Sequence, residues 1–539
     1  MTRERTDQIL ADQISLRAER NPDFPVLTFE CAGKPDEART FAQLHQRANR
    51  LAAALITRGL ERGDRFALMM RNHPEFAEAM IAALISATVF VPIDPRTRGD
   101  KLAYTLRNSG ARAILLADYN LEQLAAVRAQ LPALELALAL ETGEEGASPL
   151  GLTPGVESLD AVLDRPAPTV DVRVESPADK LQILYTSGTT GDPKGVVMDN
   201  ARMGGSGILG TLFGFTCDDR LYTGLSLTHG NAQAVTLASA IFHEIPAVIS
   251  RRFTKSRLWD ICRRHGSTTF SLLGGMATAI YSEPPKPNDA DNPVRFVTSA
   301  GMPRAIWESF ERRFDLRILE WYGAVEGGLA LKPIGSGPIG SFGKPPATLE
   351  MKILDEEDRE CPPHVQGEIC TRPSTGGEPQ VEYLGNPQAS ARKTARGWLR
   401  SGDVGHTYED GWFFFDYRKG GGIRHNGDFV NAGFVEKVVA EHPAVADVFV
   451  YGVPASSGAP GEKDVVAAVV PLAGATLDPA SLFAHCRAGL EANFVPSYLQ
   501  VVDEIPKTAS EKPQERFLLD AFATGAANVH SAGSYGHAG

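Results

Sequence analysis

The sequence predicts an α/β protein with a large N-terminal domain of two α/β-layered subdomains plus a β-rich subdomain, followed by a small, mobile α+β C-terminal domain. Between about residues 40 and 120, helical patterns alternate with short apolar strands, as in 41–58 followed by 65–70. Such alternation is typical of parallel sheets covered by helices. It recurs at 257–273 and 304–321, which predicts a second layered subdomain.

The chain changes character at 335–383, where Gly and Pro are dense and short strands are expected at 350–354 and 367–370. This segment predicts the β-rich subdomain. Three adjacent glycines at 420–422 favour a bend or pivot, because glycine adopts backbone angles that other residues avoid. About a hundred residues with a small α+β pattern follow. The expected divisions are residues 1–417, residues 418–525 and an unstructured tail at 526–539 whose apolar content is too low to pack.

The length and composition of the chain argue against several classes of protein, including nucleic-acid-binding, membrane-spanning and secreted proteins. A chain of 539 residues is long enough for several cores. A formal net charge of −12 does not favour nucleic acid as a partner. The longest apolar stretch, about 79–92, is shorter than the roughly 18–20 residues of a membrane span, and the first residues lack the apolar core of a signal peptide. The six cysteines include no C-x-x-C pair, so neither a zinc site nor a disulfide framework is expected. These features together predict a cytoplasmic protein.

Residues 185–195 read Y-T-S-G-T-T-G-D-P-K-G, a short segment of hydroxyls, glycines and one lysine. Gly188, Gly191 and Gly195 permit positive φ angles, so that successive backbone N–H groups can converge on an anion. Lys194 adds a full positive charge. The segment predicts a loop that holds the phosphates of a nucleotide; the alternative is a Gly- and Thr-rich surface hairpin.

The loop is not a Walker A sequence, which ends in G-K-[ST] at a fixed spacing. Here Gly191 is followed by Asp192, Pro193 and then Lys194. The apolar runs at 181–184 and 195–198 predict a strand on each side of the loop. The expected loop therefore joins two strands and needs no helix dipole.

Together with four later strings, the loop resembles the adenylate-forming superfamily of acyl-CoA synthetases, carrier-protein adenylation domains and luciferases. The likeness covers about 41–518, is greatest to acyl-CoA ligases, and is weaker to the carnitine/crotonobetaine-type and medium-chain members among them. The later strings are W-Y-G-A-V-E-G at 321–327, S-G-D at 401–403, the glycine pivot with I-R-H-N-G-D at 423–428, and P-K-T-A-S-E-K at 506–512.

The resemblance implies a nucleotide site. Tyr322 is expected to stack on adenine and Glu326 to bind Mg²⁺, while Asp403 accepts hydrogen bonds from the ribose hydroxyls and Arg418 reaches the same ribose. Val325 replaces a threonine whose hydroxyl would meet the α-phosphate, so Thr186 or a backbone N–H is expected to satisfy that oxygen. The expected nucleotide and coenzyme A ligands are Thr186, Ser187, Gly188, Thr189, Thr190, Gly191, Lys194, Ser299, Ala300, Gly301, Tyr322, Gly323, Ala324, Val325, Asp403, Arg418, Arg424 and Gly427, with Thr186 and Glu326 as metal ligands.

The resemblance also implies the catalytic groups. Lys512 falls on the family's catalytic lysine, although Glu511 stands where a glycine is usual. Gly420 occupies the hinge position, usually Asp or Lys. His229 resembles a residue that gates the acyl pocket, and Glu326 completes the expected catalytic set.

The implied function is an ATP-dependent carboxylate–CoA ligase that uses ATP, Mg²⁺ and coenzyme A. Acyl-AMP and pyrophosphate would form first, and the thioester would form after the C-terminal domain rotates. The expected partners are these small molecules and a carboxylic acid, with no nucleic acid or membrane; the acid's identity and a homodimer are left open. The alternatives are an enzyme that loads a free-standing carrier protein and a non-catalytic nucleotide- or acyl-binding protein.

Overall fold

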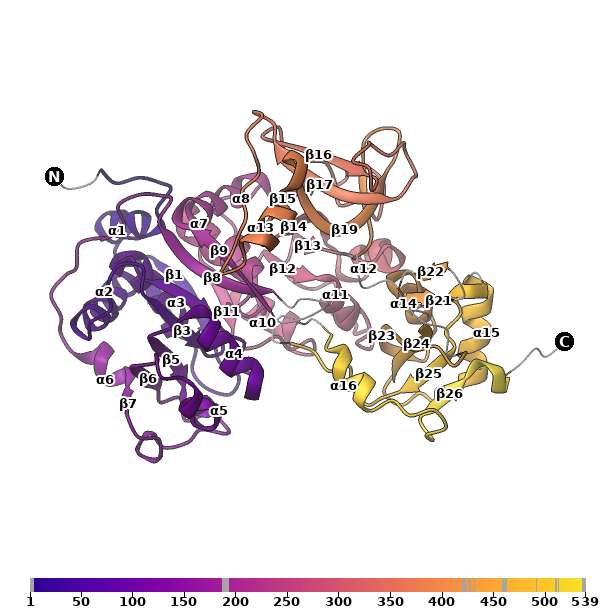
Figure 1. Cartoon of the computed structure of the whole chain (residues 1–539), viewed down its shortest axis with the longest axis horizontal. Coiled ribbons are helices and arrows are strands. Elements are labelled where there is room, and N and C mark those ends of the chain that lie inside the picture. The colour runs from indigo at the N-terminus through magenta and orange to yellow at the C-terminus, as the bar shows by residue number, and fades with distance from the viewer. Residues whose placement is uncertain are drawn as a thin grey trace. The chain divides into compact units, whose positions relative to one another are not determined.

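The computed structural model forms two compact units (Figure 1). The first comprises residues up to 271 together with 293–296 and 381–392, and the second comprises 272–292, 297–380 and the residues from 393. The predicted boundary at 417/418 is not a boundary of these units and stays a prediction. The residues described are 4–186, 193–418, 423–425, 428–430, 432–457, 463–490, 492–508, 511 and 513–535.

The first unit contains an eight-stranded sheet in the order β18-β9-β8-β4-β3-β5-β6-β7. Strands β4, β3, β5, β6 and β7 run parallel (Figure 1, indigo to magenta). Buried leucines of helices α4 and α5 join one core with the sheet. This confirms the first predicted α/β layer. The bounds are β3 Arg65–Met69, β4 Val89–Pro92, β5 Ala113–Ala117, β6 Leu136–Leu140, β7 Val156–Ser158, β8 Lys180–Thr186, β9 Lys194–Asp199, β18 Glu382–Tyr383, α4 Gly99–Ser109 and α5 Leu121–Val127.

A second set of parallel strands lies in the same unit. Strand β11 pairs with both β1 and β10, β10 pairs with β12, and β2 adds an antiparallel edge. None of the helices in the described part of the chain is long and apolar enough to cross a membrane. The bounds are β1 Pro25–Glu30, β2 Glu37–Thr40, β10 Leu221–Thr223, β11 Ala247–Ser250, β12 Thr269–Leu273, α1 Leu10–Arg20, α2 Phe41–Thr57, α3 Pro74–Ser86, α6 Leu159–Asp164, α7 Asn200–Ser206, α8 Ile208–Leu212, α9 Ser239–His243 and α10 Leu258–His265.

The second unit contains the predicted β-rich part, an antiparallel four-stranded sheet in the order β16-β17-β19-β20 (Figure 1, orange). Before it in the chain, strands β14 and β15 form an antiparallel hairpin. The bounds are β13 Phe296–Ala300, β14 Arg317–Ala324, β15 Gly327–Lys332, β16 Leu349–Leu354, β17 Gly367–Pro373, β19 Leu399–Thr407, β20 Phe413–Arg418, α11 Gly274–Tyr281 and α12 Trp307–Phe314. Helix α13, Pro387–Lys393, belongs to the first unit except for its last residue.

The C-terminal part of this unit is the predicted small α+β fold, built on a sheet in the order β23-β24-β25-β26. Helices α14 and α15 share a core with this sheet, in which Val435, Val465 and Phe483 are fully buried. The bounds are β21 Ile423–His425, β22 Asp428–Val430, β23 Val445–Pro454, β24 Lys463–Pro471, β25 Tyr498–Val501, β26 Val529–Ser531, α14 Ala432–Ala440, α15 Pro479–Gly489 and α16 Glu515–Asp520.

The structure corrects the prediction of an unstructured tail from residue 526, as far as residue 535. Strand β26 pairs with β25, with Gln500 opposite Val529. The ring of Tyr535 lies 5.6 Å from that of Phe483, measured between centroids. Val529 and Tyr535 therefore anchor a segment in which most residues are small or polar. The average composition of the segment does not reveal such single anchoring residues. Residues 536–539 lie outside the described part.

Candidate active site

The Y-G-A-V-E-G string forms the tip of the β14–β15 hairpin. Val325 and Glu326 make the two-residue turn, and Gly327 follows with a φ of +140°. A Cβ on Gly327 would come within 2.7 Å of Leu399, the first residue of β19. The hairpin tip is thus held against the strand that carries the S-G-D string. Glu326 is only 8% exposed there, so its carboxylate lies in a largely desolvated position.

Tyr322 and Asp403 lie 81 residues apart in the sequence, yet their side chains are bonded. The Tyr322 hydroxyl donates to Asp403 Oδ2 at 2.6 Å, and its ring stacks on Phe342 at a centroid distance of 4.7 Å. Burial raises the pKa of Tyr322, so the phenol stays a proton donor. The structure therefore brings together the two side chains that the sequence assigned to adenine and ribose.

Asp403 also faces Arg418. The two residues are opposite each other in the β19–β20 pairing, and Arg418 Nε lies 3.8 Å from Asp403 Oδ1. Burial raises the pKa of Asp403, while Arg418 and the Tyr322 hydroxyl oppose that rise. A buried carboxylate beside an arginine is suited to accepting the two hydroxyl groups of a ribose, because an ionised carboxylate only accepts hydrogen bonds.

Glu320 is a residue of this region that the sequence reasoning missed. Its carboxyl group accepts hydrogen bonds from Gly301 N at 2.5 Å and from Met302 N at 3.1 Å. Gly301 has a φ of +96°, and a Cβ on Gly274 would come within 2.3 Å of Gly301 O. Glu320 therefore fixes a tight loop directly after β13, which ends with the expected ligands Ser299 and Ala300. The sequence could have indicated this role, because Glu320 is an acidic residue within the otherwise apolar string I-L-E-W-Y.

The burial of Glu320 has a consequence for stability. Burial raises the pKa of this carboxyl group to about 8, while the unfolded chain loses the proton near its ordinary value of 4.5. Between these values the folded state binds more protons than the unfolded state, so stability falls as pH rises, by up to about 1.4 kcal/mol per pH unit. Glu320→Gln is expected to remove this slope, measured by urea unfolding at pH 5, 6, 7 and 8.

The exposed Glu308 provides the control for that experiment. Its side chain is 66% exposed, so Glu308→Gln should leave the slope of the wild type intact. Parallel stability curves for the wild type and Glu320→Gln would contradict the assignment of a raised pKa to Glu320.

In the first unit, the structure confirms that the phosphate-loop sequence joins two strands. Strands β8 and β9 are antiparallel, with Thr186 opposite Lys194. The ammonium group of Lys194 lies 5.6 Å from the centroid of the Tyr383 ring. Both loop ends are thus anchored in the sheet. The expected ligands Ser187, Gly188, Thr189, Thr190 and Gly191 lie outside the described residues.

His229 lies before an unusual helix in the same unit. Its Nδ1 accepts a hydrogen bond from Asn231 N at 3.1 Å, and a π-helical segment follows at Ala232–Ala238. π-Helical turns are rare and are frequent at functional sites. The geometry agrees with a fixed orientation of the His229 ring, and the gating role stays a prediction.

Several expected residues of the C-terminal part fall outside the described residues, namely Gly420, Gly427 and Lys512, together with the side chain of Arg424. Glu511, next to Lys512, is described and has a φ of +59°. This left-handed conformation favours glycine, the usual family residue at that position. The backbone therefore keeps a glycine-like conformation despite the glutamate.

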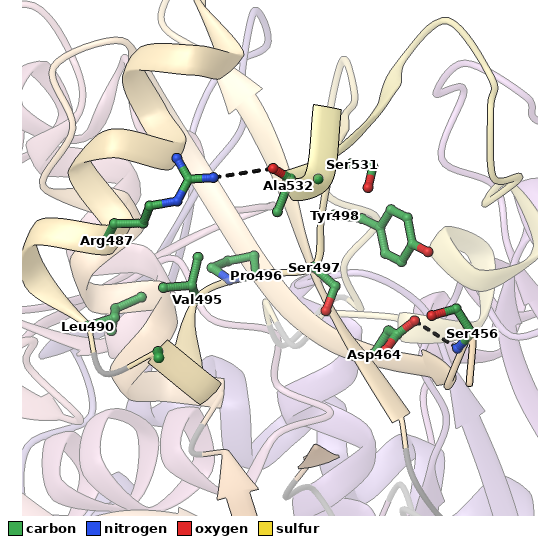
Figure 2. Close-up of a pocket in the computed structure, with 12 residues that line it drawn as sticks. Ser456, Asp464, Arg487, Leu490, Val495, Pro496, Ser497, Tyr498, Ser531 and Ala532 are labelled. Atoms are coloured by element: carbon green, nitrogen blue, oxygen red, sulfur yellow. Dashed lines mark hydrogen bonds between the residues drawn. The ribbon is translucent and has the colours of Figure 1, made fainter. Parts of the chain in front are cut away.

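A cavity of about 540 Å³ lies in the C-terminal part of the second unit (Figure 2). Arg487 in its wall donates to Ala532 O at 3.2 Å, and Asp464 accepts from Ser456 N at 2.8 Å. Apolar walls come from Leu490, Val495 and Pro496. The lining of this cavity includes no residue that the sequence predicted for nucleotide, acid or thiol, so the cavity does not mark the predicted active site.

Glu326 suits the expected metal ion in donor type. Mg²⁺ prefers oxygen ligands and is commonly held by one or two carboxylates together with substrate phosphates. In the described part of the chain, no three His, Cys, Asp or Glu side chains are grouped to hold a metal ion by themselves. A magnesium site at Glu326 would therefore be completed by the nucleotide.

Two family models match the chain. Residues 14–376 match the AMP-binding enzyme model, and residues 435–512 match the AMP-binding enzyme C-terminal domain. This chain belongs to the AMP-binding enzyme family. The resemblance inferred from the motifs is thus confirmed, as is the expected enzyme class, an AMP-forming ligase.

Known proteins similar to this AMP-binding enzyme carry the names of CoA ligases. It is 27% identical over 499 residues to a crotonobetaine/carnitine–CoA ligase of Salmonella agona, covering 91% of this chain and 95% of that protein. A benzoate CoA ligase from Burkholderia xenovorans superposes with a TM-score of 0.80 at 22% identity, covering 95% and 99% of the two chains.

A third relative is the o-succinylbenzoate CoA synthetase of Bacillus subtilis in complex with ATP and magnesium ion. It superposes on this enzyme with a TM-score of 0.76 at 23% identity, and 94% of this chain and 99% of that chain are covered. The structural matches confirm the predicted α/β fold with its small C-terminal domain.

Proposed function

We propose that this AMP-binding enzyme is an ATP-dependent carboxylate–CoA ligase that uses Mg²⁺. The observation that carries the proposal is the assembly of Tyr322, Asp403 and Arg418 beside the hairpin tip that holds Glu326. Each of these residues belongs to a motif from which a nucleotide or metal contact is expected, and their proximity supports the proposal. The names of the relatives support coenzyme A as the acceptor.

In the first half-reaction, a carboxylate oxygen of the acid attacks the α-phosphorus of ATP, and the bond from that phosphorus to the pyrophosphate oxygen breaks. Negative charge moves onto the leaving pyrophosphate. Lys194 and the hydroxyl-rich loop would neutralise it, and Lys512 would stabilise the charge that builds where the acid meets the α-phosphate. Mg²⁺, held by Glu326 and the Thr186 hydroxyl, would supply further charge neutralisation.

In the second half-reaction, the thiolate sulfur of coenzyme A attacks the acyl carbonyl carbon, and the bond from that carbon to the AMP oxygen breaks. The chain offers Lys512, at the end of the P-K-T-A-S-E-K string, for the first step and the segment with Arg424 and Gly427 for the second. We infer that the C-terminal domain turns about Gly420 between the steps. Two geometries at one site require such a mobile domain.

Pyrophosphate exchange tests the proposal. The wild-type enzyme with Mg·ATP and radiolabelled pyrophosphate should form labelled ATP only when an acceptable carboxylic acid is present. The acid panel covers short and medium aliphatic acids, aromatic acids, crotonobetaine and carnitine. A protein without exchange for any acid would be the non-catalytic binder that the Val325 and Glu511 departures suggest.

The thiol acceptor requires a second readout. Coenzyme A added after exchange is established should yield an acyl-CoA thioester detectable by mass spectrometry. Exchange without a thioester would instead favour transfer to a free-standing carrier protein. A cytoplasmic location and a homodimer stay predictions, and light scattering reports directly on the second.

A further inference from the structure

Lys393, the last residue of helix α13, is a cation that the sequence motifs did not single out. Its side chain is partly buried, and its Nζ donates to the backbone oxygen of Ser401 at 2.8 Å. Ser401 begins the S-G-D string, and its hydroxyl accepts from Asp403 N at 2.9 Å. The ammonium group of Lys393 is therefore anchored on the strand that presents Asp403, the carboxylate expected to bind the ribose.

Three buried carboxylates act electrostatically on this ammonium group. Glu326, Asp403 and Glu368 are 8%, 6% and 5% exposed. All three carboxylates raise the pKa of Lys393, whereas the guanidinium group of Arg418 lowers it. Glu368 is engaged by Gly402 N and by Arg400, each at 2.9 Å. Asp403 is engaged by Tyr322 and Arg418. Of the three carboxylates, Glu326 has the strongest electrostatic effect on Lys393.

Burial lowers the pKa of Lys393, and Glu326 opposes that change more than the other carboxylates do. Removing an ammonium group from water is costly unless partners compensate for the lost hydration. An ammonium group has three donor hydrogens, and the Ser401 oxygen takes one of them. The arrangement thus anchors a positive charge at Ser401 O, where it interacts electrostatically with Glu326 and Asp403.

The position of this charge indicates its ligand. In a nucleotide, the α-phosphate is attached directly to the ribose, which Asp403 is expected to hold. At the neighbouring hairpin turn, Val325 offers only an aliphatic side chain. We propose that Lys393 binds the α-phosphate of the nucleotide and supplies the donor that the side chain at position 325 lacks. This inference rests on the proposed function and adds a nucleotide ligand to it.

Calorimetric titration with AMP and with adenosine tests the proposal, in magnesium-free buffer and without any turnover. Lys393→Met keeps the aliphatic stem and removes the charge. It is expected to weaken AMP binding by roughly 10–100-fold, the usual loss for one charge-assisted hydrogen bond. Adenosine has the same base and ribose without the phosphate, so its affinity should stay within about 2-fold.

Two further variants sharpen the test. Lys393→Arg keeps the positive charge and should retain most of the AMP affinity. The double variant Lys393→Met, Val325→Thr has a hydroxyl group at the hairpin turn. It should recover part of the AMP affinity that Lys393→Met alone loses. Lys352→Met is the matched control, because Lys352 pairs with Glu360 at 2.7 Å on another strand of the same unit.

Equal weakening of AMP and adenosine by Lys393→Met would overturn the proposal, because Lys393 would then only brace the S-G-D strand. Unchanged AMP affinity would overturn it as well. Both results are distinguishable from failure of the proposed function, since acid-dependent pyrophosphate exchange by the wild type tests that function separately.

Discussion

Lys512→Ala is expected to slow acyl-adenylate formation by roughly 10²–10³, the usual loss for one group that stabilises transition-state charge. The expectation follows from the chemistry of the step. Charge builds on the oxygens around the α-phosphorus as the carboxylate attacks, and an ammonium group there stabilises the transition state more than the bound substrates. Pyrophosphate exchange with a saturating acid measures this half-reaction.

The same variant should form thioester from preformed acyl-adenylate and coenzyme A at nearly the wild-type rate, because no new bond to phosphorus is made in that step. The matched control is Lys507→Met, five residues earlier, where the ammonium group pairs with Asp447 at 2.5 Å. Lys507→Met should not slow one half-reaction more than the other. Equal losses in both half-reactions of Lys512→Ala would remove Lys512 from its catalytic assignment.

Gly420→Pro is expected to leave adenylate formation nearly intact and to abolish thioester formation. Proline fixes φ near −65°, and a fixed dihedral angle at the pivot would prevent the C-terminal domain from changing its orientation. Rapid-quench measurement of acyl-adenylate and of acyl-CoA separates the two effects. The variant should accumulate acyl-adenylate on the enzyme.

Gly420→Ala is the control for this experiment, since alanine has no ring and retains rotation about φ. It should keep thioester formation. Full overall turnover of Gly420→Pro would contradict the hinge assignment, and a loss of adenylate formation in the same variant would show a folding defect rather than a blocked rotation.

The fold was largely predictable because hydrophobic periodicity reports local structure. The expected helix at 41–58 corresponds to α2, and the strands expected on both sides of the phosphate loop are β8 and β9. The tail was mispredicted for a physical reason. Pairing of β26 with β25 and burial of one tyrosine depend on the rest of the domain, and the local sequence does not contain that information.

Residues of the candidate site could be predicted where they belong to a sequence motif. Residues that only packing brings into the site could not be predicted. Tyr322 and Asp403 were both assigned, and the structure joins them through a hydrogen bond. Glu320 and Lys393 were missed, because each bonds a backbone group of another strand or loop. An isolated lysine at a helix end carries no sequence signal of that kind, and only the folded chain shows what its ammonium group faces.

The stoichiometry of the complete reaction tests most directly whether this enzyme is an AMP-forming carboxylate–CoA ligase. The wild-type enzyme is incubated with Mg·ATP, coenzyme A and an acid that supports exchange, and all products are quantified by mass spectrometry. An AMP-forming carboxylate–CoA ligase should yield one AMP, one pyrophosphate and one acyl-CoA for each ATP consumed. Formation of ADP and phosphate with the thioester, or ATP consumption without any acyl product, would contradict this assignment.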